Sequence, residues 1–343
     1  MQPGLPRIGA RLDQELDPHR CIELAVAVEA GGYSSLWFAE NPLHRAILPA
    51  LSACALHTER ISLGIGIVNV YQHHPSLIAM EAGALDELAG GRVVLGIGSG
   101  VGARIARLGF DYRPIAALRD AIQIIRPLLR GEEANHRGRV FSADRVRLGF
   151  RPTRPDMPIY FASMGDRSLA LCGALADGLI ISNMCPPGYS ERAVAIVKDA
   201  AAAAARPLPS VVQYVPCAVR PGRDEARHLA KAAIGEMLAT FWPVGSDWPA
   251  LRETIVQHSG VTKVEMTAAV ERLRRGEPAI RVLDDRFVAA FAIAGTAEEC
   301  LRTATRYRRA GVNELVLTFS GTQPAEDIAY LGRAIADHRP DGA

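Results

Sequence analysis

Glycine-rich and polar segments follow several short apolar runs, and two of them have the residue types that hold a flat, phosphate-bearing ligand. Residues 159–168 (IYFASMGDRS) predict a strand, a short loop and the start of a helix. Free N–H groups and the helix dipole bind phosphate at such a helix start. Residues 95–100 (LGIGSG) place glycines at a strand end, where a planar ring can approach the backbone.

Two further segments carry candidate ligand-contacting residues. Residues 61–75 combine a β-branched strand containing Gly64 and Gly66 with a polar stretch and a helix that starts at Pro75. A glycine inside a strand marks a bulge or a close approach of another group to the backbone. Residues 38–44 place Glu40, Asn41 and His44 after another apolar run, so these side chains can donate or accept hydrogen bonds at a strand end.

The elements that must position these residues alternate between short strands and amphipathic helices that end at small residues. The predicted strands are residues 7–12, 35–38, 61–67, 92–97, 158–162, 178–181, 211–219 and 313–318. The predicted helices are residues 18–30, 46–57, 76–89, 113–129, 167–176 and 189–205. This alternation predicts an α/β fold, a (β/α)8 TIM barrel, in which function lies at the carboxyl ends of the strands.

Two connections are too long for a minimal strand-helix unit, and they predict insertions at about residues 101–157 and 222–312 within a single barrel of residues 1–343. The first contains a predicted hairpin at residues 136–148, and the second contains predicted helices near residues 227–242 and 263–275. The second insertion also contains three aromatic residues, Phe241, Trp242 and Trp248. They could line an apolar entrance for the substrate. The alternative is that they pack inside the insertion or at a contact between subunits.

Composition excludes several other classes of protein. The formal charge of +2 comes from 39 basic and 37 acidic residues spread along the chain, without the basic stripe that a nucleic acid partner needs. No apolar run approaches the roughly 20 residues that span a bilayer, so we expect a cytoplasmic protein without membrane contact. The 6 cysteines lack metal-ligand spacing, which favours buried free thiols and no metal site.

Residues 61–75 (ISLGIGIVNVYQHHP) and 85–100 (LDELAGGRVVLGIGSG) together resemble the bacterial luciferase-like superfamily of flavin and deazaflavin oxidoreductases. The similarity is greatest to its F420-dependent methylene-tetrahydromethanopterin reductase branch. Residues 31–40 (GGYSSLWFAE), 174–180 (ALADGLI), 294–299 (AGTAEE) and 310–315 (AGVNEL) extend the resemblance over nearly the whole chain.

The resemblance implies a ring cofactor, coenzyme F420 or alternatively FMN, lying over the strand ends. A bulge in the third strand would back the ring through Gly66, Ile67 and Val68, with a non-prolyl cis peptide at Gly66-Ile67. The resemblance also implies that Gly98 and Ser99 border the edge of the ring. The residues implied to contact the cofactor phosphate are Ser163, Met164 and Gly165. Asp166 is expected to cap the following helix instead.

This chain departs from the family pattern at two positions. Where relatives carry an acidic residue followed directly by His, it has Glu40-Asn41, so Glu40 or Asn41 is expected to hydrogen-bond the ring, and the His that could transfer a proton is absent from this position. Where the reductases carry a catalytic Glu in the first strand, it has Arg11, which is expected to bind an anionic group of substrate or cofactor. Asp13, two residues on, is an alternative carboxyl group.

His73 and His74 precede Pro75 at a predicted helix start. The resemblance covers His74, for which a hydrogen-bonding role at the helix start competes with a place in the cofactor wall.

These observations predict an F420-dependent oxidoreductase that transfers a hydride to or from a small organic substrate, for which a pterin-linked one-carbon unit is one candidate. Arg11, Asp13 and Glu40 are the candidate catalytic residues. An FMN-dependent luciferase-like monooxygenase is the alternative, and a flavin-binding protein without catalysis is a further one. The resemblance also implies a homodimer.

Overall fold

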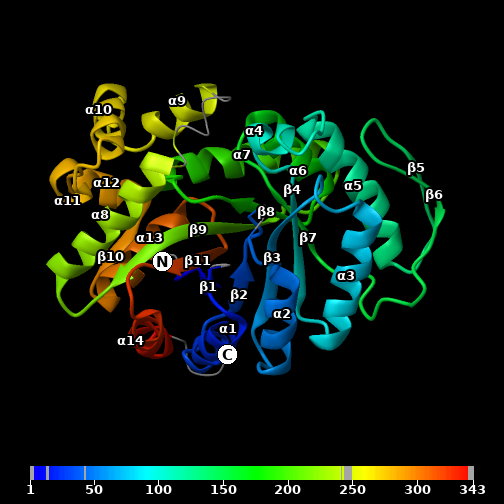
Figure 1. Cartoon of the computed structure of the whole chain (residues 1–343), viewed down its shortest axis with the longest axis horizontal. Coiled ribbons are helices and arrows are strands. Elements are labelled where there is room, and N and C mark those ends of the chain that lie inside the picture. The colour runs from blue at the N-terminus through cyan, green and yellow to red at the C-terminus, as the bar shows by residue number, and fades with distance from the viewer. Residues whose placement is uncertain (1–3, 13–14, 42–43, 241, 243–248, 339–343) are drawn as a thin grey trace.

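A closed barrel of parallel strands forms the centre of the protein (Figure 1). The computed structural model describes residues 4–12, 15–41, 44–240, 242 and 249–338. The barrel strands are β1 (Arg7–Leu12), β2 (Ser35–Phe38), β3 (Ser62–Asn69), β4 (Val93–Gly98), β7 (Ile159–Ala162), β8 (Gly178–Ile181), β9 (Ser210–Val219) and β11 (Glu314–Phe319). Each strand pairs in parallel with the next, and β11 pairs with β1, which closes the ring. The predicted (β/α)8 barrel is confirmed.

Helices form a second ring around the strands. They are α1 (Pro18–Ala30), α2 (Ile47–Leu56), α3 (Pro75–Leu88), α5 (Pro114–Leu129), α6 (Asp166–Leu175), α7 (Pro187–Ala203), α13 (Ala297–Arg309) and α14 (Pro324–Asp337). Each helix contacts the next in this order, and α14 contacts α1. At that last contact a Cβ on Gly332 would lie 2.8 Å from the Gly31 backbone, so glycine is needed for the two helices to approach this closely.

Local sequence signals explain where these helices begin and end. Asp17 caps α1, because its side chain accepts hydrogen bonds from the N–H groups of His19 and Arg20. The chain leaves α1 through Gly32, whose φ of 75° suits glycine. Thr296 and Glu299 form a capping box at the start of α13, in which each side chain accepts a hydrogen bond from the other residue's backbone N–H.

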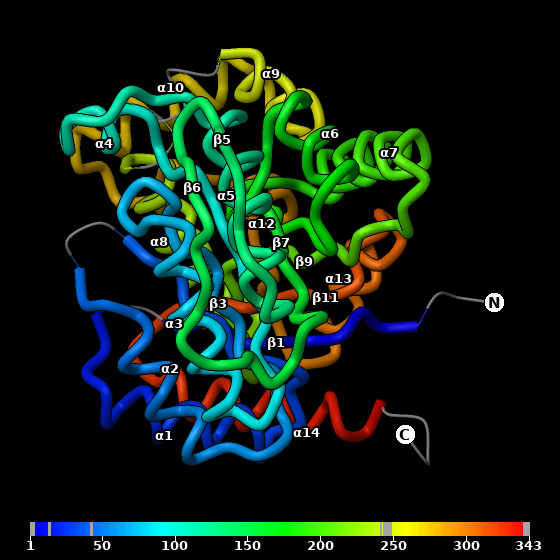
Figure 2. The backbone as a smooth tube through the Cα atoms, turned by 90° about the vertical axis from the view of Figure 1, so that its right-hand side faces the viewer, coloured from blue at the N-terminus to red at the C-terminus, as the bar shows by residue number. Residues whose placement is uncertain are grey.

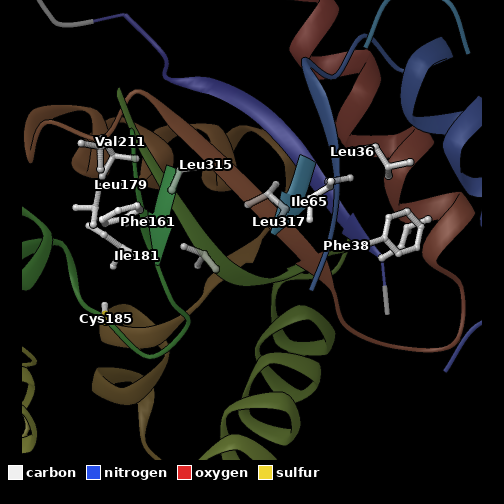
Figure 3. Close-up of a cluster of buried hydrophobic side chains, with 14 of the residues drawn as sticks. Leu36, Phe38, Ile65, Phe161, Leu179, Ile181, Cys185, Val211, Leu315 and Leu317 are labelled. Carbon is white, nitrogen blue, oxygen red and sulfur yellow. The ribbon is translucent and has the colours of Figure 1, made fainter. Parts of the chain in front are cut away.

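Side chains on the two faces of each strand belong to different apolar clusters. Leu36, Phe38, Leu315 and Leu317 lie in the main core between strands and helices, part of which is shown in Figure 3. The intervening residues point into the barrel, where Trp37, Tyr160, Ile180, Val212, Tyr214 and Val316 form a separate buried cluster. Because strand side chains alternate, the residues that follow this inner cluster toward the carboxyl ends face the mouth of the barrel.

Additional elements lie within the two long connections. The first holds α4 (Gly102–Ala106) and an antiparallel hairpin of β5 (Ala134–Arg137) and β6 (Ser142–Val146), which confirms the predicted hairpin. Figure 2 shows the hairpin running along the outside of the barrel. The second holds α8 (Arg223–Thr240), α9 (Pro249–Gln257), α10 (Lys263–Arg274), α11 (Ala279–Val282), α12 (Asp285–Phe291) and β10 (Ile293–Gly295), which pairs with β9. The predicted helices near residues 227–242 and 263–275 correspond to α8 and α10.

The two long connections also supply ring helices, α5 from the first and α13 from the second. Trp242 packs against the main core, whereas Phe241 and Trp248 lie outside the described residues. All 6 cysteines are buried free thiols, as predicted. Within the described part of the chain, no helix is long and apolar enough to cross a membrane, and no cluster of side chains has the composition of a metal site.

Candidate functional site

A bulge interrupts β3 where the strand reaches the mouth of the barrel. Ile65 pairs with Leu95 of β4, but Val68 pairs with Ile97, so β3 contains one extra residue between these two pairs. The Gly66-Ile67 peptide bond within this bulge is cis, which confirms the prediction made for it. Ile67 remains partly exposed and packs on the inner aromatic cluster, so its side chain faces the mouth.

Hydrogen bonds from two other strands hold the bulge in place. The buried Tyr214 of β9 donates from its hydroxyl to the Gly66 carbonyl oxygen at 2.9 Å. The Glu40 N–H, just after β2, donates to the Ile67 carbonyl oxygen at 3.2 Å. The Glu40 Oε2 atom accepts from the Asn69 N–H at 3.0 Å. Both carbonyl groups of the bulge are therefore satisfied within the protein.

The glycines of β3 and β4 make room for neighbouring side chains. A Cβ on Gly66 would overlap the Tyr214 hydroxyl and lie 2.6 Å from the Trp37 ring. A Cβ on Gly98 would lie 2.9 Å from the Ile67 Cδ1 atom. The Ile67 side chain occupies the space beside Gly98, which is one of the glycines expected to let a ring approach the backbone. Gly98 instead fixes the position of Ile67, which presents an apolar surface to the mouth.

The other residues predicted to back or border a ring lie differently from Ile67. The Val68 side chain is buried in the main core, so only its backbone is near the mouth. Ser99 is partly exposed, and its hydroxyl lies 3.3 Å from that of Tyr112. Tyr112 also donates to the Gly100 carbonyl oxygen at 2.9 Å, and its ring stacks near Tyr71. These contacts place Ser99 at an aromatic rim of the mouth.

Glu40 is linked to the surface through a histidine. Its Oε1 atom lies 3.0 Å from His73 Nε2, and His73 Nδ1 lies 4.0 Å from an oxygen of Glu81 on α3. The hydrogen bond to Glu40 raises the pKa of His73, which favours the charged imidazolium. Since both Glu40 oxygens have partners, this residue acts in the structure as a bridge between β2 and the end of β3.

The neighbours of Glu40 and His73 have separate positions. Asn41 is partly exposed and follows Glu40 toward the mouth, whereas His44 is exposed. His74 caps α3, because its Nδ1 atom accepts from the Ser76 N–H at 3.3 Å. The helix-start role expected for His74 is therefore the correct one.

The loop after β7 combines a buried hydroxyl with an accessible helix start. Ser163 is 3% exposed, and its Oγ atom has no hydrogen-bond partner among the described residues. Gly165 is the first residue before α6, and a Cβ there would meet only Ser168 Oγ, at 3.9 Å. The first N–H groups of any α-helix lack partners within the helix. Met164 is partly exposed, and its carbonyl oxygen accepts from the Tyr189 hydroxyl.

The expectation that Asp166 caps α6 is wrong. The cap residue is Gly165, and no side chain caps this helix. Asp166 instead forms a bidentate ion pair with Arg192 of α7, with both N–O distances at 2.8 Å. The hydrogen bonds from Arg192 lower the pKa of Asp166. The carboxylate turns toward a neighbouring helix because its position inside the first turn lets it reach the guanidinium.

Arg11 lies at the end of β1, on the face of the strand that points into the barrel. Its guanidinium carbon is 5.4 Å from the centroid of the Tyr214 ring. Its Nε atom is buried and has no hydrogen-bond partner among the described residues. Asp13 lies outside the described residues.

Sequence reasoning missed several residues of the mouth. Tyr214 and Thr318 lie on strands β9 and β11. Neither residue follows a glycine-rich or polar segment, which is the sequence signal that indicated the other candidate residues. Asn183, just after β8, lies beside Arg11. Asn183 could have been found in the sequence because it directly follows a predicted strand. Tyr214 and Thr318 could have been found from the alternation of side chains along their strands.

The site residues therefore lie at the carboxyl ends of the strands, where (β/α)8-barrel enzymes place their binding and catalytic groups. The model of the family of luciferase-like monooxygenases matches residues 5–314. The chain belongs to this family. It is an oxidoreductase, as its relatives are.

Three relatives illustrate this similarity. A 5,10-methylenetetrahydromethanopterin reductase from Archaeoglobus fulgidus is 28% identical over 316 residues, which cover 90% of this chain and 92% of the relative. An F420-dependent glucose-6-phosphate dehydrogenase from Beutenbergia cavernae is 27% identical over 346 residues, covering 95% and 94%. The solved coenzyme F420-dependent tetrahydromethanopterin reductase from Methanopyrus kandleri has a TM-score of 0.86 at 22% identity, covering 98% and 99%, and shares the fold.

Proposed function

We propose that the protein is a coenzyme F420-dependent oxidoreductase that transfers a hydride to or from a small organic substrate. The observation that carries the proposal is the proximity of Ile67, Gly98 and Ala162, with Ser163 directly after Ala162 in the chain. A Cβ on Gly98 would lie 2.9 Å from Ile67 and 3.6 Å from the Ala162 Cβ, so Gly98 joins the two. This arrangement leads from an apolar wall to a helix start with an unpartnered hydroxyl, which suits a flat ring that carries a phosphate.

The residues of the chain fit such a cofactor. The Ile67 side chain, which packs against Gly98, would lie against one face of the ring. Gly66 and Val68 would contact the ring through their backbone atoms. Ser99 and Asn41 would lie at its edges. Ser163, Met164 and Gly165 would contact the phosphate through a hydroxyl and backbone N–H groups. The buried Ser163 hydroxyl supports this assignment, because an unsatisfied buried polar group costs about 1–3 kcal/mol unless a ligand pairs with it.

When bound, a deazaflavin would supply the hydride acceptor or donor that side chains lack. The protein would orient the substrate, exclude water and position polar groups. Glu40 would keep the bulge in place through the Ile67 carbonyl oxygen and the Asn69 N–H. Arg11 would lie at the substrate side of the mouth, next to Tyr214. Asp13 stays a candidate for a carboxyl group near β1.

The names of the relatives favour F420, since two of the three similar proteins are named as F420-dependent. The test is a titration of the purified apoprotein with F420 and, separately, with FMN, followed by intrinsic fluorescence and by the absorption of each cofactor. We expect tighter binding of F420. Tighter binding of FMN would instead support an FMN-dependent monooxygenase, and binding of either without turnover of any tested reductant would support a non-catalytic flavin-binding protein.

We also infer a homodimer. Leu56 of α2 and Leu77, Met80 and Leu88 of α3 are 67%, 47%, 42% and 43% exposed. These neighbouring helices thus present large apolar side chains to solvent, which is typical of a surface that associates with another copy. Light scattering of the purified protein should give twice the chain mass, and the variant Met80→Lys should lower it.

A further inference from the structure

Arg11 has a position in the barrel that calls for a negatively charged ligand. Along β1, Ile8, Ala10 and Leu12 are buried in the main core, so Arg11 points the other way, into the mouth. The pairing of Ala10 with Leu317 places Arg11 beside Thr318 on β11. Val316 belongs to the inner cluster, so Thr318, two residues on, faces the same space.

Among the residues that the structure describes, no carboxylate balances the charge of Arg11. No acidic side chain of the described residues lies within ion-pair distance of its guanidinium, although ion pairs are numerous elsewhere in this part of the chain. Two uncharged residues contact the Arg11 guanidinium. Its guanidinium lies over the Tyr214 ring at 5.4 Å. With the Asn183 amide oriented so that both of its ends are satisfied, the Asn183 oxygen accepts from Arg11 Nη1 at 3.1 Å.

Two buried polar atoms at these neighbouring strand positions, Arg11 Nε and Thr318 Oγ1, lack hydrogen-bond partners among the described residues. Leaving a buried donor unpaired is unfavourable, and more so for a charged group. One ligand group would satisfy both. A carboxylate accepts paired hydrogen bonds from a guanidinium in one plane, and its second oxygen can accept from a hydroxyl.

We propose that Arg11 and Thr318 form a subsite for an oxyanion of the substrate, a carboxylate group in particular. This inference rests on the proposed function, because it assigns the substrate to the part of the mouth that β1 and β11 form, whereas the Ile67 wall belongs to β3. Tyr214 connects the two sides, since its ring contacts Arg11 while its hydroxyl donates to the Gly66 carbonyl oxygen. The substrate class is therefore a small organic acid, held by its carboxylate next to the carbon that gains or loses the hydride.

The first measurement is the affinity of F420 for the wild-type protein and for Arg11→Ala. Absence of F420 binding to the wild type would refute the proposed function and leave the subsite to be tested on the apoprotein. If F420 binds to the wild type but not to Arg11→Ala, the oxyanion belongs to the cofactor and the substrate subsite is refuted. We expect both proteins to bind F420 with similar affinity.

The second measurement titrates the F420 complex with acetate, pyruvate and benzoate, and with the uncharged acetone and benzamide. We expect the carboxylates to bind and Arg11→Ala to weaken them about tenfold or more, in keeping with the loss of a charged hydrogen bond. Arg11→Lys should retain part of the affinity, and Thr318→Val should lose a smaller part.

Arg302→Ala is the matched control, because it removes the same charge from the exposed face of α13. Its carboxylate affinity should equal that of the wild type. The proposal is overturned if none of the carboxylates binds to the wild-type complex, or if Arg11→Ala and Arg302→Ala bind them equally. Unfolding midpoints of all variants identify any that fail to fold, and Arg11→Lys keeps the test valid if Arg11→Ala is among them.

Discussion

The hydroxyl of Tyr214 should have a measurable role in both stability and cofactor binding. Tyr214→Phe removes the hydrogen bond to the Gly66 carbonyl oxygen and leaves that buried acceptor without a partner. Such a change costs about 1–3 kcal/mol in the free energy of unfolding. The aromatic ring stays, so its contacts with Trp37 and Arg11 are kept. Any further effect must come from loosening the bulge that carries Ile67.

Tyr33 provides a closely matched control. Its side chain is buried, its hydroxyl donates to the Ile328 carbonyl oxygen at 2.9 Å, and its ring makes an edge contact with Phe319 at 6.1 Å. Tyr214 has the same hydrogen-bond length and an edge contact with Trp37 at the same centroid distance. Tyr33 lies in the main core outside the barrel and not in the inner cluster that contains Tyr214. Tyr33→Phe should therefore cost similar stability without affecting the cofactor.

The assay combines urea unfolding with F420 titration for both variants. We expect comparable losses of unfolding free energy, and a rise in the F420 Kd for Tyr214→Phe alone of about fivefold, which corresponds to about 1 kcal/mol. If Tyr33→Phe raised the Kd as much as Tyr214→Phe, the effect would be a general one, and the link from Tyr214 through the bulge to the ring site would be wrong. An unchanged stability of Tyr214→Phe would equally refute the assigned hydrogen bond.

Three other predictions concern single residues of the mouth. The hydrogen bond to Glu40 raises the pKa of His73, so this pair stabilises the fold fully below about pH 6.5 and less as the pH rises through the raised pKa of His73. His73→Gln should remove this stabilisation, and the unfolding midpoints of wild type and variant should therefore converge at high pH. Ser163→Ala should raise the unfolding free energy of the apoprotein, because it removes a buried hydroxyl that has no partner among the described residues, yet weaken F420 binding in a titration. Gly98→Ala should force the Ile67 side chain to move, costing about 1 kcal/mol of unfolding free energy and raising the F420 Kd.

Most of the barrel could be predicted from the sequence because its elements have strong local signals. The predicted helix of residues 18–30 coincides with α1, since Asp17 and Pro18 mark its start and Gly31-Gly32 mark its end. The predicted strands of residues 7–12, 35–38 and 178–181 also coincide with β1, β2 and β8. Helices α13 and α14 were missed, although the Thr296–Glu299 capping box was visible in the sequence.

The candidate site could be predicted less completely, for two physical reasons. The cis peptide at Gly66-Ile67 was identified through resemblance to a family, because no local pattern of residues specifies such a bond. The second reason is that the hydrogen bonds of Glu40 depend on where strands β2 and β3 end at the mouth of the barrel, which the sequence pattern does not specify. The pairing of Glu40 with His73 joins residues 33 positions apart, and no spacing in the sequence indicates that distance.

The close contact of Gly332 with Gly31 has a consequence for biosynthesis. The first and last helices of the ring meet there, and β1 obtains its second neighbour from β11, near the end of the chain. A ribosome delivers the N-terminal segments first. Throughout most of translation, β1 therefore presents an open edge of unpaired N–H and C=O groups, which can recruit strands from other chains. Nascent chains of this protein are thus most exposed to aggregation until β11 emerges, and a truncation before Glu314 would prolong that state indefinitely.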